Sequence, residues 1–427
     1  LLVCVSKMLS KKLGIKDITN KLNGARVLIR ADFNVPIKAG RVTDNARVAK
    51  TIPTIKTALE SGAKNVVLMS HLGRPKGNRS DQFSMKPVVP VLENLLGREV
   101  EFLSDCVGSD VEEACRNADA GKIILLENLR FHAAEEGKGV TPAGEKIKAG
   151  QDEIDAFRSS LSTLGDIFIN DAFGTAHRAH SSMVGVDLPL RAAGHLMKKE
   201  LEYFGGALEN PHRPLLVILG GAKVKDKIKL ITNMLNIVDE MIIGGGMAFT
   251  FKKVLDGVNI GGSLFDDESI DLVRQIMDQA NEKGVKIHLP VDFICGDQLK
   301  EGGQVATYTQ EQGIPDGWFG LDNGPLSTAE NLAACARAKS VIWNGPQGVI
   351  ENEAFKQGSL ALLNALTAQS QAKESTVIIG GGDTAGFVKN EGCDEKVDHV
   401  STGGGASLEL LEGKVLPGVK ALSDKEQ

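Results

Sequence analysis

Residues 376–384 read Thr-Val-Ile-Ile-Gly-Gly-Gly-Asp-Thr, a pattern typical of a buried strand that passes through a glycine turn into a helix. Two further glycine triplets, at residues 244–246 and 403–405, also end predicted strands. Such a turn points backbone N–H groups and the positive helix end outward, which suits an anion such as phosphate. The triplets therefore predict that the chain binds a nucleotide.

Short apolar runs alternate with helical patterns along the rest of the chain. The predicted strands are residues 26–30, 65–69, 122–126, 166–169, 215–219, 240–243, 285–289, 340–343 and 376–379. The clearest helical patterns are residues 48–59, 225–235, 270–279 and 353–366. Continuous hydrophobicity marks strands that are covered on both faces, and alternation with helices indicates parallel sheets. We expect an α/β protein with two open sheets.

The length of 427 residues favours two domains, because one hydrophobic core rarely serves so long a chain. Residues 198–208 form a helical pattern, and residues 209–214 (Glu-Asn-Pro-His-Arg-Pro) interrupt the chain before the next strand. We place the domain boundary near residues 190–214, with a connecting helix. The 6 cysteines show no C-x-x-C spacing, which argues against a zinc site or a disulfide framework and fits reduced thiols in the cytosol.

Charge is unevenly distributed between the two halves of the chain. Residues 1–200 carry 29 Lys and Arg against 24 Asp and Glu, net +5, whereas residues 201–427 carry 20 against 31, net −11. The basic half suits a small anion, although ordinary variation between two surfaces explains the difference equally well. An aromatic content of 4% and the lack of a basic run argue against a nucleic-acid partner.

The sequence also bears on location. No apolar stretch reaches the roughly 18 to 20 residues that a membrane span needs, so we expect no membrane segment. Residues 1–7 precede the first Met, and we leave them out of the fold as an upstream remnant. We expect a cytoplasmic protein.

Four arginines of the basic half, Arg47, Arg74, Arg130 and Arg178, are candidates for binding the anion. Three of them follow predicted strands by a few residues, and parallel strands bring such positions to one edge of the sheet. Arginine binds phosphate and carboxylate bidentately, so together they would form an anion pocket. Taken singly, each is more often a surface residue. The two histidines of residues 174–182 are as reasonable in hydrogen-bonding or structural roles as in catalysis.

The acidic half offers two lysines and a carboxylate. Lys223 and Lys227 follow a predicted strand four residues apart, which puts both ammonium groups on one face of a helix start, facing either phosphates or solvent. Asp383 directly follows a glycine triplet and suits Mg²⁺ held by one carboxylate, with phosphates as further ligands. The alternative for Asp383 is a helix N-cap.

Other nucleotide motifs are missing or weak. The chain has no G-x-x-x-x-G-K-[ST] and no H-R-D loop, so neither P-loop nor protein-kinase chemistry is supported. Gly380, Gly382 and Ala385 satisfy a relaxed G-x-G-x-x-A, which leaves an NAD-dependent dehydrogenase as an alternative. That fingerprint belongs on the first strand of a domain, whereas this one stands near the end of the chain.

Eight motifs follow one another along nearly the whole chain. They are RADFNVP (30–36), SHLGRP (70–75), ENLRF (127–131), NDAF with the following GTAHRAHSS (170–182), GGAKV (220–224), WNGP (343–346), GGGDT (380–384) and STGGGAS (401–407). In this order they closely resemble the motifs of the phosphoglycerate kinase family.

The resemblance implies two Rossmann-like domains with parallel sheets flanked by helices, joined by an interdomain helix. The expected bounds are 8–193 for a 3-phosphoglycerate-binding domain, 194–210 for the helix and hinge, 211–411 for a nucleotide-binding domain, and 412–427 for a tail that packs back on the first domain. The implied activity is reversible, Mg²⁺-dependent phosphoryl transfer between ATP and 3-phosphoglycerate, giving ADP and 1,3-bisphosphoglycerate, in glycolysis and gluconeogenesis. It also implies closure about the hinge and a monomeric enzyme.

The resemblance assigns site residues as well. The expected ligands of 3-phosphoglycerate are Asp32, Asn34, Arg47, His71, Arg74, Arg130 and Arg178. The expected ligands of the nucleotide are Gly221, Lys223, Lys227, Gly245, Gly246, Asn344, Pro346, Glu351, Gly382, Asp383 and Thr384, with Asp383 also at Mg²⁺. The expected catalytic groups are the side chains of Arg47 and Lys223 and the backbone donors of Gly381 and Gly404.

Four positions depart from the family pattern. Ala31, Gln347 and Ile350 stand where Val, Val and Phe are usual, and Asn323 stands where other residues are common. We expect these changes to affect mainly the shape of the adenosine pocket.

The implied chemistry agrees with the residues at hand, because a carboxylate acceptor is already ionised at pH 7 and needs no general base. Transfer then depends on positioning and on neutralising charge. A catalytically silent binding protein is a third hypothesis, and the presence of every charged residue that the transfer needs argues against it.

Overall fold

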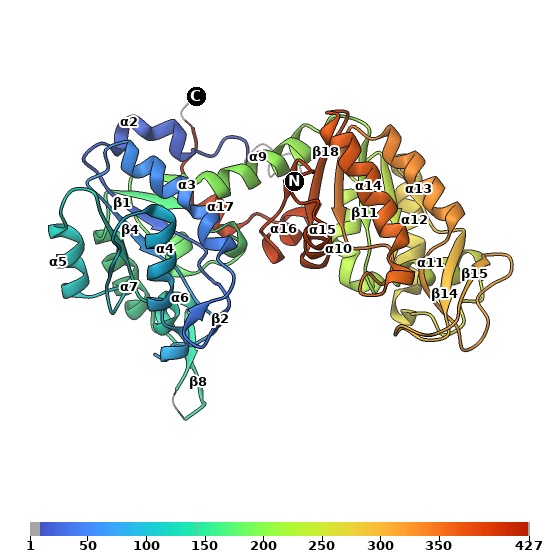
Figure 1. The fold of residues 1–427 in the computed structure, drawn as a ribbon, viewed down its shortest axis with the longest axis horizontal. Coiled ribbons are helices and arrows are strands. Elements are labelled where there is room, and N and C mark those ends of the chain that lie inside the picture. Colours follow the sequence, from blue (N-terminus) through green and yellow to red (C-terminus); the bar gives the residue numbers. More distant parts are fainter. Residues whose placement is uncertain (1–8, 142, 426–427) are drawn as a thin grey trace. The chain divides into compact units, whose positions relative to one another are not determined.

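The computed structural model describes residues 9–141 and 143–425, which divide into two units (Figure 1). The N-terminal unit consists of the described residues up to Glu202 together with the segment from Val415 onward. The C-terminal unit is Tyr203–Lys414. The division falls inside helix α9 (His195–Glu209), so one helix contributes residues to both units. Our expectation for residues 1–7 lies outside the described residues.

The N-terminal unit is built on a six-stranded parallel sheet. In spatial order its strands are β10 (Arg191–Ala193), β9 (Ile167–Asn170), β1 (Arg26–Arg30), β4 (Asn65–Met69), β6 (Lys122–Leu125) and β5 (Glu101–Phe102). Two small antiparallel hairpins are β2 (Ile37–Lys38) with β3 (Arg41–Val42), and β7 (Lys138–Val140) with β8 (Lys146–Lys148).

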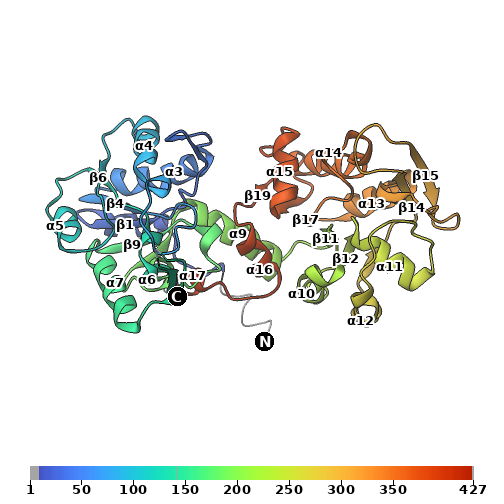
Figure 2. The same ribbon diagram turned by 90° about the horizontal axis from the view of Figure 1, so that it is seen from below.

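Helices cover both faces of this sheet, which explains why its strands are continuously apolar. Alternate residues of β1 take opposite sides: Val27 and Ile29 pack with α3 and α4, whereas Leu28 packs with α5 and α7. Figure 2 shows α3 and α4 on one side of the strands and α7 on the other. The helices of this unit are α2 (Thr19–Leu22), α3 (Ala46–Glu60), α4 (Val89–Leu96), α5 (Ser109–Asn117), α6 (Ala133–Glu136), α7 (Gln151–Thr163), α8 (Ser181–Val184) and α17 (Pro417–Lys420).

The C-terminal segment belongs to this unit through α17. The Gly418 N–H donates to the carbonyl oxygen of Ala176 at 2.9 Å, and the Ser423 N–H donates to that of Arg191 at 2.8 Å. The chain therefore closes the unit with residues from both of its ends.

The C-terminal unit repeats the same architecture. Its six parallel strands, in spatial order, are β13 (Lys286–His288), β12 (Glu240–Ile243), β11 (Leu215–Leu219), β17 (Ser340–Asn344), β18 (Thr376–Gly380) and β19 (His399–Val400). Figure 2 shows α13, α14 and α15 on one side of the sheet and α10 and α12 on the other. The helices are α10 (Val224–Met234), α11 (Met247–Asp256), α12 (Ile270–Lys283), α13 (Pro325–Arg337), α14 (Gln357–Gln371), α15 (Gly382–Asn390) and α16 (Gly405–Leu411).

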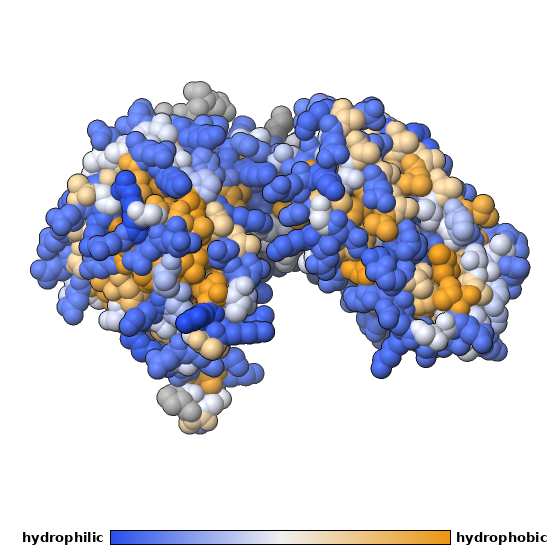
Figure 3. Space-filling model, in the orientation of Figure 1, coloured by the Kyte–Doolittle hydropathy of each residue, from blue (hydrophilic) through white to orange (hydrophobic). Residues whose placement is uncertain are grey.

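A three-stranded antiparallel sheet, which the sequence patterns did not predict, is attached to this unit. It pairs β14 (Asp292–Gly296) with β15 (Val305–Thr309) and β16 (Phe319–Asn323). Figure 3 shows apolar residues gathered on the surface over β14 and β15. Val305, which begins β15, and Leu299, in the β14–β15 connection, are exposed apolar side chains.

The predicted fold class is confirmed: the protein is α/β, with two parallel sheets flanked by helices. All nine predicted strands occur, each within one residue at either end. In the part of the chain that the structure describes, no helix has the length and apolarity to cross a membrane.

Candidate active site

The predicted 3-phosphoglycerate ligands lie at the carboxyl edge of the N-terminal sheet. Asp32 and Asn34 follow β1, His71 and Arg74 follow β4, Arg130 lies in the short helix after β6, and Arg178 follows β9. Since these strands are parallel neighbours, their ends meet at one edge, where open α/β sheets bind ligands.

Hydrogen bonds hold the loops of this edge together. The Gly73 N–H donates to Asn34 Oδ1 at 2.9 Å, and Arg130 Nη1 donates to the Gly73 carbonyl oxygen at 2.9 Å. The Phe33 N–H donates to Ser70 Oγ at 2.9 Å. The loops after β1, β4 and β6 are thereby fixed relative to one another.

Arg47 reaches the same edge from the first turn of α3, and its Nη1 donates to Asp32 Oδ2. The arginines form one electrostatic cluster, because Arg178 and Arg74 lower the pKa of Arg130 in addition to the larger effect of burial. A site with so much positive charge on a rigid sheet edge suits a ligand with several anionic oxygens.

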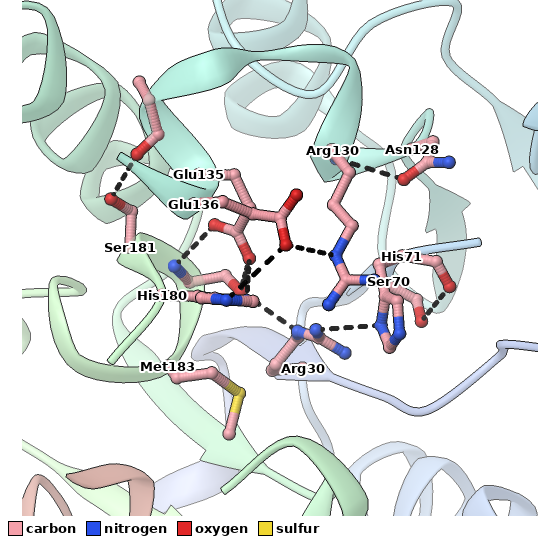
Figure 4. A network of polar contacts seen from close by, with 12 residues as sticks. Arg30, Ser70, His71, Asn128, Arg130, Glu135, Glu136, His180, Ser181 and Met183 are labelled. Atoms are coloured by element: carbon pink, nitrogen blue, oxygen red, sulfur yellow. Dashed lines mark hydrogen bonds and ion pairs between the residues drawn. The ribbon is translucent and has the colours of Figure 1, made fainter. Parts of the chain in front are cut away.

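A buried polar network lies beneath this cluster (Figure 4). Arg30, the last residue of β1, contacts His71 and Ser182, and Ser182 in turn contacts Glu135. Sequence reasoning quoted Arg30 within a motif but gave it no role, and it missed Glu135. The available signal was an arginine at the end of a strand whose central residues are apolar, since a buried charge needs a partner.

Of the two histidines in residues 174–182, His180 lies beside two glutamates of α6. Burial, together with Arg130 and Arg30, lowers the pKa of His180 to about 3, so this imidazole is neutral at physiological pH. His180 lies 3.9 Å from Glu135 and 3.7 Å from Glu136.

The C-terminal unit contains a cavity of about 670 Å³ at the carboxyl ends of β11, β12, β17 and β18. All the predicted nucleotide ligands except Lys223 line it, as do the predicted catalytic glycines. The predicted residues that line the cavity are Gly221, Lys227, Gly245, Gly246, Asn344, Pro346, Glu351, Gly381, Gly382, Asp383, Thr384 and Gly404. The volume lies within the range of sites for cofactor-sized ligands.

Glycines shape this cavity in two ways. Gly220 and Gly345 lie where the loops after β11 and β17 touch, and a Cβ on either would overlap the backbone of the other loop. Gly381 has a φ of +82° and is the N-cap of α15, where its conformation turns the strand into the helix. Backbone groups can therefore approach a ligand closely here.

Charged groups enter the cavity from two helix starts. Lys227 of α10 donates to Asn344 Oδ1, and burial lowers its pKa while Asp383 and Glu412 act in the opposite direction. Asp383 is exposed in the first turn of α15 and makes no capping hydrogen bond, so the N-cap alternative is wrong. Lys223 is the exposed N-cap residue of α10 and does not line the cavity.

The sequence patterns did not predict the apolar wall of the cavity. It consists of Phe249, Leu264, Leu299, Phe319 and Leu321, several of them from the unpredicted antiparallel sheet and its connections. An apolar wall suits a nucleobase. The only available signal was a set of isolated apolar residues in a loop-rich region.

Two of the sequence departures are partners. Asn323 Nδ2 donates to Gln347 Oε1 at 3.3 Å, and both side chains are buried at the cavity. Gln347 Nε2 also donates to the Leu219 carbonyl oxygen at 3.4 Å. Gln347, at a position where Val is usual, thus forms a buried polar pair with Asn323.

The structure thus has two α/β units, one with an arginine-rich sheet edge and one with a glycine-lined cavity. Comparisons with known proteins specify the family. The family model described as phosphoglycerate kinase matches residues 15–414.

Curated relatives match over nearly their whole length. A phosphoglycerate kinase of Tetrahymena thermophila is 59% identical over 420 residues, covering 98% of this chain and 100% of the relative. Phosphoglycerate kinase 2 of Homo sapiens is 57% identical over 417 residues, covering 97% and 99%.

Solved structures agree. Phosphoglycerate kinase from Coxiella burnetii superposes with a TM-score of 0.85 at 37% identity and covers 96% of this chain and 98% of that one. The enzyme from Pyrococcus horikoshii OT3 gives a TM-score of 0.71 at 28% identity over 96% and 98% of the two chains. The chain belongs to the phosphoglycerate kinase family. The dehydrogenase alternative is not supported: its first glycine, Gly380, ends β18, which lies next to the edge strand of the sheet, and Gly382 begins α15.

Proposed function

We propose that the protein catalyses reversible, Mg²⁺-dependent phosphoryl transfer between ATP and the carboxylate of 3-phosphoglycerate. The observation that carries this proposal is the pairing of two anion sites of different chemistry in one chain. The arginine-rich edge offers bidentate donors for a small phosphorylated acid. The glycine-lined cavity offers an apolar wall for a base and backbone amides for phosphates.

No general base is needed in this reaction, because the acceptor carboxylate is ionised at pH 7. Catalysis then consists of bringing the acceptor oxygen in line with the γ-phosphoryl group and neutralising its spread charge. We assign that neutralisation to Arg47 and Lys223 and to the backbone N–H groups at Gly381 and Gly404. Transfer requires the two bound substrates to meet, so closure about the hinge is part of the proposal.

Asp383 is the residue that would hold Mg²⁺. Magnesium keeps several waters and binds through one or two carboxylates plus substrate phosphates. The exposed carboxylate of Asp383 at the cavity fits that requirement. Among the described residues, one cluster of three potential metal ligands occurs, Asp105, Cys106 and His132, and it belongs to the other unit. Asp383 is therefore not part of such a cluster, and the nucleotide phosphates would supply further ligands to the ion. The bound ion would neutralise phosphate charge.

A coupled assay with ATP, 3-phosphoglycerate and Mg²⁺ tests the proposal. We expect turnover that needs all three, and no turnover with NAD in place of ATP. Folded protein that binds ATP but transfers no phosphoryl group to 3-phosphoglycerate would instead support the catalytically silent binding protein.

A further inference from the structure

Arg30 is a fully buried charge with a complete set of partners. It ends β1, and its exposed fraction is 0%. Nε donates to Ser182 Oγ at 3.0 Å, Nη1 donates to the Ala31 carbonyl oxygen, and Nη2 lies 3.1 Å from His71 Nδ1. The guanidinium therefore joins the strand end to two loops of the substrate edge.

The contact between Arg30 and His71 has only one possible polarity. A guanidinium carries donors and no acceptor. Nδ1 of His71 must accept, so it carries no hydrogen. A neutral imidazole with an unprotonated Nδ1 carries its hydrogen on Nε2, and a cationic imidazole would place a second N–H against the arginine.

The contacts of Arg30 on the Ser182 side also have a defined donor and acceptor. The Ser182 hydroxyl accepts from Arg30 and donates to Glu135 Oε1 at 2.7 Å, and the Ser182 N–H donates to Glu135 Oε2 at 2.9 Å. Both oxygens of Glu135 accept, so the carboxylate is the counter-ion of the buried arginine. Burial raises the pKa of Glu135, and Arg30 is the largest influence that opposes this.

The surroundings of His71 also disfavour a cation, because they lower the pKa of its imidazole. Burial is the largest influence that lowers its pKa, followed by Arg30, Arg130, His180 and Arg47. Within the described residues, no hydrogen bond involves Nε2 of His71, which leaves that N–H available to a ligand.

We propose that Arg30, anchored by Ser182 and Glu135, is a positioning residue that holds His71 neutral with its hydrogen on Nε2, so that this nitrogen donates to an anionic oxygen of the acceptor substrate. This inference rests on the proposed function for the identity of the ligand. The tautomer itself does not depend on it. His71 then contributes a directed donor among the arginines without adding a further positive charge, and it binds substrate without taking up a proton.

Nitrogen-15 NMR of histidine-labelled, substrate-free protein tests the tautomer, with His71→Asn to assign the signal. We expect the Nε2–H tautomer, unchanged between pH 5.5 and 8.5. A Nδ1–H tautomer, an exchanging mixture or a cation at pH 7 would overturn the proposal.

Kinetics test the positioning role. Arg30→Met should raise the KM for 3-phosphoglycerate about 10- to 100-fold, the usual value of a hydrogen bond to a charged group, with the KM for ATP unchanged. The His71 signal should lose its fixed tautomer in the same variant. Arg26→Met is the matched control, since Arg26 begins the same strand, pairs with Asp166 at 2.7 Å and lies away from the site.

A second variant tests the same role if Arg30→Met does not fold. Ser182→Ala keeps the arginine and removes only its hydroxyl anchor, and we expect a smaller rise in the same KM. An unchanged KM together with an unchanged tautomer in Ser182→Ala would contradict the anchoring role. Wild-type protein with the expected tautomer but no turnover would overturn the proposed function and leave the tautomer standing.

Discussion

The two candidate sites use the same part of the same architecture, yet they are built from different atoms. At the N-terminal sheet edge, the polar groups are side chains, and Asn34, His71 and Arg130 are each held by a hydrogen bond to a neighbouring strand or loop. In the C-terminal cavity, the loops touch through glycines, and backbone groups form the rim. The first site should therefore fail when a group is removed, and the second when an atom is added.

The largest expected effect is from adding one methyl group to the C-terminal site. Gly345→Ala places a Cβ against the backbone of Gly220 at a φ of +112°, where neither strand end can move without breaking the sheet. We expect a loss of more than about 4 kcal/mol of unfolding free energy, seen as an unfolded C-terminal unit in denaturant titrations.

Gly386→Ala is the control for that variant. A Cβ at Gly386, inside α15, meets no atom within 4 Å. It should leave the free energy of unfolding unchanged or raise it by up to about 1 kcal/mol, since Ala favours helix. Equal losses in both variants would show that the close contact of the two loops is not what matters.

The next effect is catalytic and comes from a side chain in the C-terminal unit. Lys223→Ala should lower kcat about 100- to 1000-fold, about 3 to 4 kcal/mol, with little change in ATP affinity, if Lys223 acts on the transferring group. Its exposed position, away from the cavity lining, is consistent with a role outside ground-state nucleotide binding. Steady-state kinetics and ATP titration separate the two quantities. The control is Lys225→Ala, on the same helix and paired with Glu268, which should change neither kcat nor ATP affinity. Equal losses of kcat and of ATP affinity in Lys223→Ala would contradict the catalytic role of Lys223.

A third effect concerns a buried carboxyl group of the N-terminal unit. Burial raises the pKa of Asp171 to about 6, although Thr54 Oγ1 and the Met197 N–H donate to it. The folded state therefore binds the proton more tightly than the unfolded chain, and stability is lost as pH rises from about 4 through about 6. In the wild type, the free energy of unfolding should fall by about 2 to 3 kcal/mol over that pH range because of this group, and in Asp171→Asn that fall should be absent. Denaturant unfolding at several pH values measures both.

Asp166→Asn provides a control of opposite sign. Arg26 lowers the pKa of Asp166 against the effect of burial, so this pair stabilises the fold above pH 4 and loses its effect as pH falls. If the Asp171→Asn variant kept the wild-type pH profile, the raised pKa would be wrong.

Sequence patterns predicted the strands and the positions at their ends, because continuous apolar runs and turn residues are local features. They did not predict β14, β15 and β16: β15 is half-exposed and lacks a clear apolar period, and β14 and β16 are short strands of mixed polar and apolar residues. The patterns therefore also failed to predict the apolar wall of the cavity, part of which comes from these strands. The charged ligands came from the motifs, whereas the tautomer of His71 depends on Arg30, whose contact is visible only once β1 and β4 are paired.

The smallest effect tests whether the glycine-built site is independent of its side chains. The atoms nearest to a Cβ at Gly244 would be those of the side-chain amide of Gln347, one of the residues that depart from the family pattern. Gly244→Ala should therefore cost about 1 to 3 kcal/mol in the wild-type background but about 1 kcal/mol less when combined with Gln347→Val, which gives the shorter side chain. A double-mutant cycle of unfolding free energies measures this coupling. Strict additivity would mean that Gly244 is required by the backbone alone, and the contrast between the two sites would then be complete.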